Sequence, residues 1–274
     1  MAKKTQNLPS YKNPPVTEVV IGVQFDQLQN FSILHHGLYF ERIKENYPKF
    51  EAHPPLSETK EIFGEPSRAV EIVPHFSNMP PLPRSWFLVA DGNKLVQLQQ
   101  DYFIHNWRKV KGDEKYPRFN NICKEFISLW NDFLKFIQEQ KLGNVLLNQW
   151  EITYVNHIDK GDIWNSLGDL GNVFNCFTNK FSKKYLPVPE KVVLNSTFAF
   201  PEKFGRLYVT LQPAMRKRDN VECLQLRLTA KGRLASNNSK SINQALDLGH
   251  EWIVLGFTDL TTNQAHKFWG REDI

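Results

Sequence analysis

Two short apolar runs constrain the fold of this chain most, because each opens a similar succession of predicted elements. "TEVVIGVQFD" occupies residues 17–26, and "QWEITYVNHID" occupies residues 149–159. Each run carries a glutamate near its start and ends on an aspartate. Because β-branched residues favour strands, each run predicts a strand. The similar element order that follows both strands indicates two related units.

The first predicted unit spans residues 1–145 and continues from its strand into a helix. The spacing of the apolar residues in "LHHGLYFERIKENYPKF" predicts this helix, which Pro48 ends. Three strands are expected next, and the "DGN" between the last two is typical of a hairpin turn. A long amphipathic helix that extends to about Lys141 closes the unit. The predicted strands are "AVEIVPHF", "SWFLVADG" and "KLVQLQQDYF"; the stripe of the first helix is Leu34, Leu38, Phe40, Ile43 and Tyr47, and that of the long helix is Ile122, Phe126, Leu129, Trp130, Phe133 and Ile137.

The second predicted unit spans residues 146–274 and repeats the same order. A broken helical pattern in "GDIWNSLGDLGNVFNCF" follows its first strand, and a helix in "SINQALDLGHEWIVLGF" closes it. Thr261 is the expected N-cap of a short last helix. The three strands between are predicted in "KVVLNSTFAF", "GRLYVTLQP" and "VECLQLRLTAKGR".

The predicted fold class is α+β, with two similar strand–helix–three-strand–helix units. In each unit a curved antiparallel sheet packs on a long helix, since alternating strands have one face to bury. The element order is similar to that of helix-grip and TATA-binding-type folds. A likeness in element order carries no function.

The composition indicates a protein of the cytoplasm. No apolar run approaches the roughly 20 residues that cross a bilayer, so no membrane association is expected. The first residues are polar and lack the apolar stretch of a secretory signal. Cys123, Cys176 and Cys223 are odd in number, widely spaced and set among apolar residues, so we expect them to be reduced and buried.

Three segments carry a resemblance to a known family. "YKNPPVTEVVIGVQF", then "LVQLQQDYFIHNWR" with "YPRF" soon after, and finally "HEWIVLGFTDLTTNQAHKFWGR" resemble a sporadically distributed, functionally uncharacterised bacterial family of about this length. The resemblance covers essentially the whole chain. It implies a context similar to that of mobile-element genes, such as genome-defence or toxin–antitoxin cargo, and it implies no catalytic residue and no cofactor.

The strongest candidate for catalysis is the polar group of Asp101, His105 and Arg108. In this hypothesis the aspartate orients the imidazole, and the histidine is the acid or base of a hydrolase-type reaction because its pKa is nearest to neutral. In the alternative, Asp101 and Arg108 close the strand into a loop while the neighbouring aromatic residues fill the core. The chain has no G-x-S-x-G elbow and no phosphate-binding loop, and its histidines lack metal-ligand spacing. The sequence therefore favours a protein without enzymatic activity, metal or cofactor.

A basic region is the candidate for binding nucleic acid. From Lys180 to Arg233 the sequence has twelve lysines and arginines against four acidic residues, although the net charge of the whole chain is only +5. Strand alternation directs the leucines of this region inward and its basic residues outward, which suits phosphate contacts and base stacking. The alternative is a solvated face that protects against aggregation. The candidate residues are Arg206, Tyr208, Arg216, Lys217, Arg218, Arg227 and Lys231.

Aromatic residues crowd the end of the chain and give two interpretations. They either lock the tail onto the body of the protein or anchor a partner. The predicted function is accordingly a binding or regulatory component, a protein-interaction module of a mobile or defence locus. Its expected partner is another protein or a second copy of the chain, and nucleic-acid binding is the alternative. The tail residues concerned are Trp252, His266, Phe268, Trp269 and Arg271.

Overall fold

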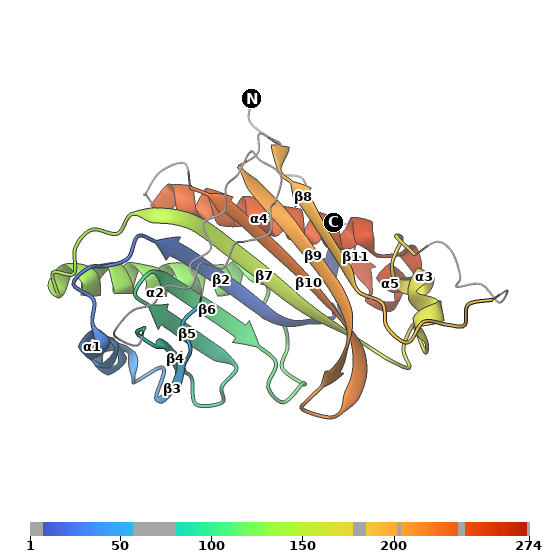
Figure 1. Ribbon diagram of the computed structural model, residues 1–274, viewed down its shortest axis with the longest axis horizontal. Coiled ribbons are helices and arrows are strands. Elements are labelled where there is room, and N and C mark those ends of the chain that lie inside the picture. Colours follow the sequence, from blue (N-terminus) through green and yellow to red (C-terminus); the bar gives the residue numbers. More distant parts are fainter. Residues whose placement is uncertain (1–7, 57–80, 178–184, 202–203, 235–238, 273–274) are drawn as a thin grey trace.

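A nine-stranded antiparallel sheet organises the chain. The computed structural model describes residues 8–56, 81–177, 185–201, 204–234 and 239–272. Within these residues the strand order is β3-β4-β5-β6-β2-β7-β10-β9-β8, and five α-helices accompany the sheet (Figure 1). The predicted α+β class is confirmed.

The elements follow one another in this order along the chain. The large sheet contains β2 (Val16–Phe25), β3 (Lys49–His53), β4 (Arg84–Leu88), β5 (Lys94–Gln99), β6 (Tyr102–Arg108), β7 (Leu147–Asp159), β8 (Leu194–Ala199), β9 (Gly205–Arg216) and β10 (Val221–Arg233). A small second sheet pairs β1 (Ser10–Tyr11) with β11 (Arg271–Glu272). The helices are α1 (Ile33–Ile43), α2 (Phe119–Glu139), α3 (Leu170–Val173), which follows the 3-10 turn Leu167–Asp169, α4 (Ser239–Leu260) and α5 (Asn263–Phe268).

The centre of the sheet is the antiparallel pair of β2 and β7, which contain the two runs that open the predicted units. Ile21 lies opposite Ile152 in this pair, and both side chains are fully buried. Strands from residues before 145 lie on one side of the pair, and strands from residues after 146 lie on the other. One continuous sheet therefore spans both halves of the chain.

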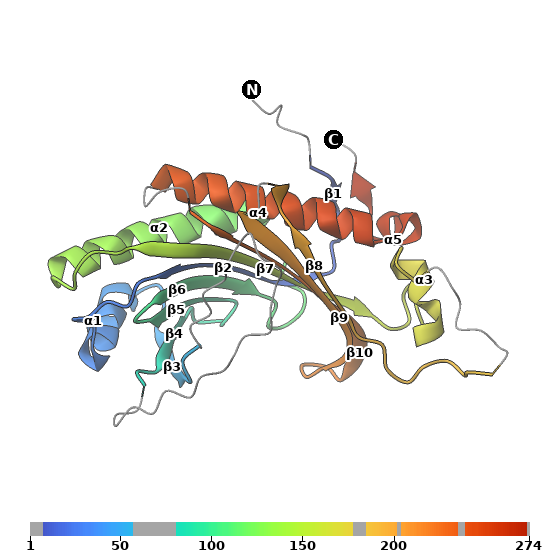
Figure 2. The same ribbon diagram turned by 45° about the horizontal axis from the view of Figure 1, so that its top comes forward.

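The long helices α2 and α4 cover one face of this sheet, which arches beneath them (Figure 2). The apolar residues of the central strands face the helices, where the ring of Phe25 packs against Trp130 and Phe133 of α2. Trp150 of β7 packs closely beneath α4 at Gly249. The stripe predicted for α2 is confirmed, since Ile122, Phe126, Trp130, Phe133 and Ile137 are buried and Leu129 is partly buried.

Helix α1 is rotated relative to the predicted stripe. Leu34 and Leu38 were expected to face the core but are 73% and 47% exposed. Ile43 and Tyr47 of the predicted stripe are buried, and Phe40 is partly buried. His36 and Tyr39, which lie outside that stripe, are buried as well. The ring of Tyr39 packs among four phenylalanines of β4, β6 and α2, and an aromatic ring buries more apolar area than leucine does. Aromatic packing therefore decides the orientation of this helix.

The strand prediction in the first half also needs correction. The predicted strand "KLVQLQQDYF" is two strands, β5 and β6, which fold back on each other through a turn at Gln100 and Asp101. The Asp101 carboxylate accepts a hydrogen bond from Gln99 at this turn, as aspartate often does in turns. Strand β3 was not predicted, and "AVEIVPHF" lies outside the described residues. The "DGN" hairpin is confirmed by the β4–β5 pair, with Gly92 at φ +76°.

Two smaller expectations differ from the structure. The N-cap of α5 is Thr262, whose side chain accepts a hydrogen bond from the Ala265 N–H, while Thr261 donates to the Phe257 carbonyl. Cys176 is exposed rather than buried, and all three cysteines are free. No helix in the described ranges is long and apolar enough to cross a membrane.

The packing of α4 on β7 gives a matched pair of substitutions. A Cβ atom at Gly249 would lie 2.4 Å from Cζ3 of Trp150, whereas one at Gly37 of α1 would meet nothing within 4 Å. We expect Gly249→Ala to lower the free energy of unfolding by about 1–3 kcal/mol through overpacking. Gly37→Ala should raise it by roughly 0.5–1 kcal/mol, because alanine is the better helix former. Urea denaturation measures both; equal effects would contradict the close α4–β7 packing.

Candidate ligand-binding cavity

A cavity of about 790 Å³ opens on the helix side of the sheet. Its lining comes from the N-terminal segment, the turn that precedes α2, strands β7 and β10, and helix α4, so both halves of the chain contribute. Pockets of this size commonly bind small molecules, particularly where two parts of a protein meet. Its apolar wall includes Tyr11, Val16, Phe119, Ile253 and Phe257.

A line of three hydrogen-bonding side chains crosses the wall of this cavity. The Tyr116 and Tyr154 hydroxyl oxygens lie 2.9 Å apart, and the Tyr154 hydroxyl lies 3.1 Å from Nδ1 of His250. The ring of Phe119 stacks on the imidazole of His250 with 4.0 Å between centroids and 8° between planes. The stack and the hydrogen bond together fix the orientation of the imidazole.

Burial keeps all three groups of this line uncharged at neutral pH. It lowers the pKa of His250 to about 4 and raises the pKa of Tyr116 to about 12. Burial also raises the pKa of Tyr154 well above its usual value. Two arrangements of the hydrogens satisfy the line. In the first, the Tyr116 hydroxyl donates to Tyr154 and the Tyr154 hydroxyl donates to Nδ1. In the second, the N–H at Nδ1 donates to Tyr154 and the Tyr154 hydroxyl donates to Tyr116. His250 Nε2, which has no hydrogen-bond partner in the described part of the chain, is a donor in the first case and an acceptor in the second.

Asn156 adds an unused acceptor to the cavity wall. It lies two residues after Tyr154 on β7, on the same face of the sheet, and is 1% exposed. Its amide nitrogen donates to the Leu226 carbonyl at 3.2 Å, which fixes the orientation of the amide. The Oδ1 atom is buried without a hydrogen-bond partner. Buried polar atoms without a partner are uncommon in proteins, and such an atom beside a cavity is a candidate ligand contact.

Charged residues lie at the more exposed parts of the lining. Arg118 donates from Nη1 to the Tyr11 carbonyl at 3.0 Å, and its guanidinium lies 5.9 Å from the ring centre of Tyr116. Asp247 and Glu251 are one turn apart on α4, and burial raises the pKa of Asp247. Among the residues that the structure describes, these three charged groups have no ion-pair partner.

The backbone at Arg118 is strained. Its φ is +71° immediately before the first residue of α2, a conformation that costs a non-glycine residue about 1–3 kcal/mol. Such strain persists only where the surrounding structure enforces it, and it often marks functional sites. Here the strained residue holds a guanidinium at the cavity.

The residues predicted for catalysis lie elsewhere and have separate partners. His105 is fully buried on β6, with Nδ1 3.2 Å from the Leu95 carbonyl and Nε2 3.4 Å from the Glu125 carboxylate. Asp101 lies in the turn before β6, and Arg108 donates to the Gly92 carbonyl at the far end of that strand. No contact joins the three side chains among the described interactions, so the arrangement agrees with the loop interpretation for Arg108.

Four residues of the predicted basic set share the sheet face opposite the helices. Arg206 lies across from Lys231, Tyr208 lies across from Thr229, and Arg227 lies across from Thr210 in the β9–β10 pair. The inward leucines of both strands are buried, as the predicted alternation requires. Arg206 was expected to be exposed on the outer face, but it is only 7% exposed. Lys231 forms an ion pair with Glu151 of β7 at 2.9 Å, which partly neutralises this face.

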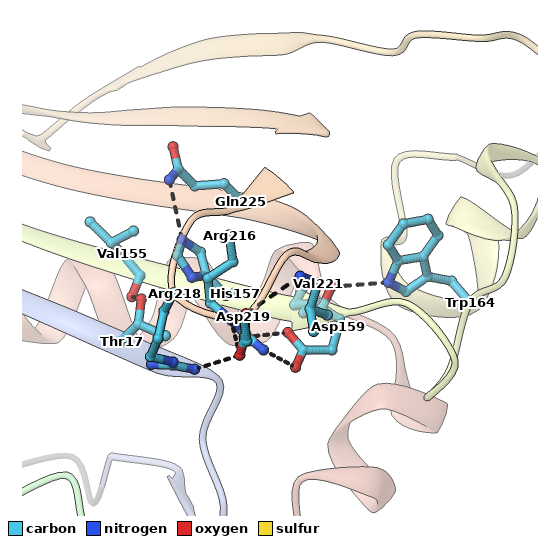
Figure 3. Close-up of polar contacts among 11 residues, drawn as sticks. Thr17, Val155, His157, Asp159, Trp164, Arg216, Arg218, Asp219, Val221 and Gln225 are labelled. Carbon is cyan, nitrogen blue, oxygen red and sulfur yellow. Dashed lines mark hydrogen bonds and ion pairs between the residues drawn. The ribbon is translucent and has the colours of Figure 1, made fainter. Parts of the chain in front are cut away.

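The other three basic residues lie at the tip of the β9–β10 hairpin, where Figure 3 shows the contacts of Arg216 and Arg218. Arg216 binds Asp159 through two hydrogen bonds of 2.7 and 2.8 Å and also binds Asp219. Arg218 lies 3.2 Å from Asp219, while Lys217 is exposed. Bidentate arginine–carboxylate pairs are strong and specific, so they lock the hairpin tip and neutralise much of its charge.

The aromatic residues of the tail lock it to the body, as the first of the two interpretations expects. Trp269 is 3% exposed and packs against Tyr11 and Phe257. His266 is buried between the Thr261 hydroxyl and the Arg271 guanidinium. The remaining two aromatics differ, since Trp252 stacks on Phe200 and Phe268 is 49% exposed.

The sequence carries no pattern that predicted the cavity as a site. Tyr116 and Arg118 are two residues apart, but Tyr154 and His250 lie far from them and from each other in the chain, and no motif spacing connects these positions. In the described part of the chain no three His, Cys, Asp or Glu side chains cluster as metal ligands would. Comparison of the chain with models of protein families, with curated proteins and with solved structures found no match.

Protonation of buried histidines should make folding stability depend on pH. The pKa of His250 and that of His36 are both lowered to about 4 by burial, whereas an unfolded histidine titrates near 6.5. Between these values the unfolded chain binds protons that the folded chain does not, so stability falls as pH falls from about 6.5 to about 4. Between pH 7.5 and pH 5 the free energy of unfolding should therefore decrease. We expect this decrease to be about 1–2 kcal/mol smaller in His250→Gln than in the wild-type protein.

Urea denaturation at the two pH values measures this effect. The parallel variant His36→Gln should remove a similar share, and the double variant should remove the sum of both, since no described contact joins the two side chains. An unchanged pH dependence in His250→Gln would mean that its imidazole is not held neutral by burial.

Proposed function

We propose that this chain is a non-enzymatic binding protein whose main site is the cavity between α2, α4 and the centre of the sheet. The observation that carries this proposal is a cavity of about 790 Å³ with Asn156 Oδ1 in its wall, a buried acceptor that has no hydrogen-bond partner among the described residues. His250, whose Nδ1 contacts Tyr154, offers its Nε2 beside this acceptor as a second polar contact for a ligand. A largely apolar pocket with a few convergent polar groups is the usual form of a small-molecule site.

The chemistry of the cavity wall favours binding over catalysis. Efficient acid–base catalysis requires groups with pKa values near the operating pH. Here the pKa of His250 is about 4 and that of Tyr116 is about 12, so at neutral pH one is a weak base and the other a weak acid. Both groups offer hydrogen bonds to a ligand far more readily than they transfer protons.

The same proposal includes a duplicated fold. The units are residues 1–145 and 146–274, each of the helix-grip type, with the cavity at the seam between them. The strand order supports this, because β6, β5 and β4 follow outward from β2 as β10, β9 and β8 follow outward from β7. The closing helix of each unit, α2 or α4, lies on the same face of the sheet (Figure 2).

The biological role that we propose is regulation within a bacterial mobile or defence locus, through a protein partner or a second copy of the chain. This context comes from the family resemblance. The segments that carry the resemblance also supply cavity residues, namely Tyr11, Tyr116, Arg118 and His250. Free cysteines are typical of the reducing cytoplasm, where we expect the protein to act.

Filling the cavity tests the proposed site. Val254 lines the cavity from α4, and Val254→Trp should occupy its volume. We expect fragments from a library of one- and two-ring aromatic compounds to bind the wild-type protein in ligand-observed NMR, with the signals at least tenfold weaker for this variant. Leu38→Trp, on the exposed side of α1, is the matched control and should leave binding unchanged. Fragments that bind both variants equally, or no binding fragment at all, would contradict the proposed site.

Nucleic-acid binding is a second candidate, favoured by the register that aligns Arg206, Tyr208, Arg227 and Lys231 on one sheet face. Arg227 is exposed and has no carboxylate partner among the described residues. If this face binds nucleic acid, Arg227→Glu should weaken binding of labelled single strands at least tenfold at low salt, and binding should fade as salt rises. Binding that neither salt nor this variant changes would exclude the face.

A further inference from the structure

We infer that the cavity binds a mononucleotide, with its base inside, its ribose at Asp247 and Glu251, and its phosphate at Arg118. This inference rests on the proposed function and names the ligand class of the same site. It follows from three groups of contacts that the cavity offers at once: aromatic surfaces, an adaptable hydrogen-bonding line, and charged groups of both signs that form no ion pair with the described residues.

The aromatic surfaces suit a planar base. The stacked rings of Phe119 and His250 form one wall, and Tyr11, Tyr116 and Phe257 also line the cavity. Because every nucleobase has a π face, base–aromatic stacking is strong for all four bases. Aliphatic ligands would fill the same volume but would not use these surfaces.

The polar atoms inside the cavity suit the edge of a base. A base edge presents both donors and acceptors, and the cavity supplies the fixed acceptor Oδ1 of Asn156. Nε2 of His250 becomes a donor or an acceptor according to the direction of the Tyr116–Tyr154–His250 line. The uncharged imidazole can therefore pair with either an acceptor or a donor on the base edge, and no charge is placed in the apolar interior.

The carboxylates of Asp247 and Glu251 suit a ribose diol. Carboxylates accept hydrogen bonds from ribose hydroxyls in other nucleotide sites. A ligand that offers hydroxyls satisfies these two groups while leaving the nearby guanidinium free for an anion. An amine would satisfy the carboxylates equally well but would be repelled by Arg118, which lines the same cavity.

The surroundings of Arg118 suit a phosphate. One of its nitrogens donates to the Tyr11 carbonyl, which orients the guanidinium and leaves its other N–H groups for a ligand. Arg118 also immediately precedes α2, a 21-residue helix with no acidic residue in its first turn and no side-chain cap. The positive end of this helix adds to the attraction for an anion.

Isothermal titration of the wild-type chain with AMP, GMP, CMP and UMP tests the inference. We expect at least one nucleotide to bind at least tenfold more tightly than its nucleoside, because the phosphate adds charge-assisted hydrogen bonds. Inorganic phosphate alone should bind far more weakly than that nucleotide. The 2′,3′-dideoxy form of the same nucleotide should also bind more weakly than the nucleotide itself. This difference in affinity should disappear in the double variant Asp247→Ala/Glu251→Ala.

Variants at Arg118 separate the phosphate contact from the rest of the site. Arg118→Gln should reduce nucleotide affinity to that of the nucleoside while nucleoside affinity stays the same, and Arg118→Lys should restore part of the loss. Lys217→Gln removes an exposed positive charge outside the cavity and should change nothing. Thermal unfolding of each variant verifies its fold.

The possible failures are distinct. If aromatic fragments bind in a manner that Val254→Trp abolishes but no nucleotide or nucleoside binds, the nucleotide assignment is wrong and the cavity remains the binding site. Nucleotide binding that Arg118→Gln leaves unchanged, or inorganic phosphate that binds as tightly as the nucleotide, would also overturn the assignment. If neither fragments nor nucleotides bind, the assignment and the proposed function both fail.

Discussion

The antiparallel pairing of β2 with β7 is the interaction on which the rest of this structure depends. It joins strands from the two halves of the chain into one sheet and so removes an edge that each half would otherwise expose. On one face it brings α2 and α4 beside each other. On the opposite face Glu151 of β7 contacts Tyr102 of β6 and Lys231 of β10, so polar contacts also cross the seam. The cavity exists because of this pairing, since its lining comes from both halves.

Much of the fold could be predicted because periodicity reports burial directly. Helix α2 and strands β9 and β10 are each buried on one face, so their apolar residues recur at the helical or the strand period. The local sequence shows this period directly. The orientation of α1 could not be predicted in this way. Leu34 and Leu38 have the right spacing, but the phenylalanines that hold Tyr39 come from β4, β6 and α2. The turn between β5 and β6 was missed because glutamines and an aspartate interrupt an otherwise continuous strand pattern only weakly.

The candidate site was harder to predict than the fold for a related reason. In the sequence, Tyr154 and His250 are indistinguishable from other partly apolar residues on the inner side of a strand or a helix. Only the folded chain brings them close to Tyr116. The backbone strain at Arg118 follows from how the chain enters α2 and leaves no mark in residue type. The tail left two interpretations open in the sequence, and the burial of Trp269 in the core agrees with the one in which the tail is locked to the body. Residue chemistry alone does not distinguish an aromatic residue that packs in the core from one that anchors a partner.

The short β1–β11 ladder has a mechanical consequence. Because Ser10 pairs with Glu272 and Tyr11 pairs with Arg271, the two ends of the chain leave this ladder on the same side. Tension applied between the ends would separate the two residue pairs of this ladder one after the other, before the force reached the large sheet. Tyr11 belongs to the second pair and also supplies a wall of the cavity and the carbonyl that orients Arg118. A load applied to the two ends of the chain would therefore act directly on the wall of the cavity.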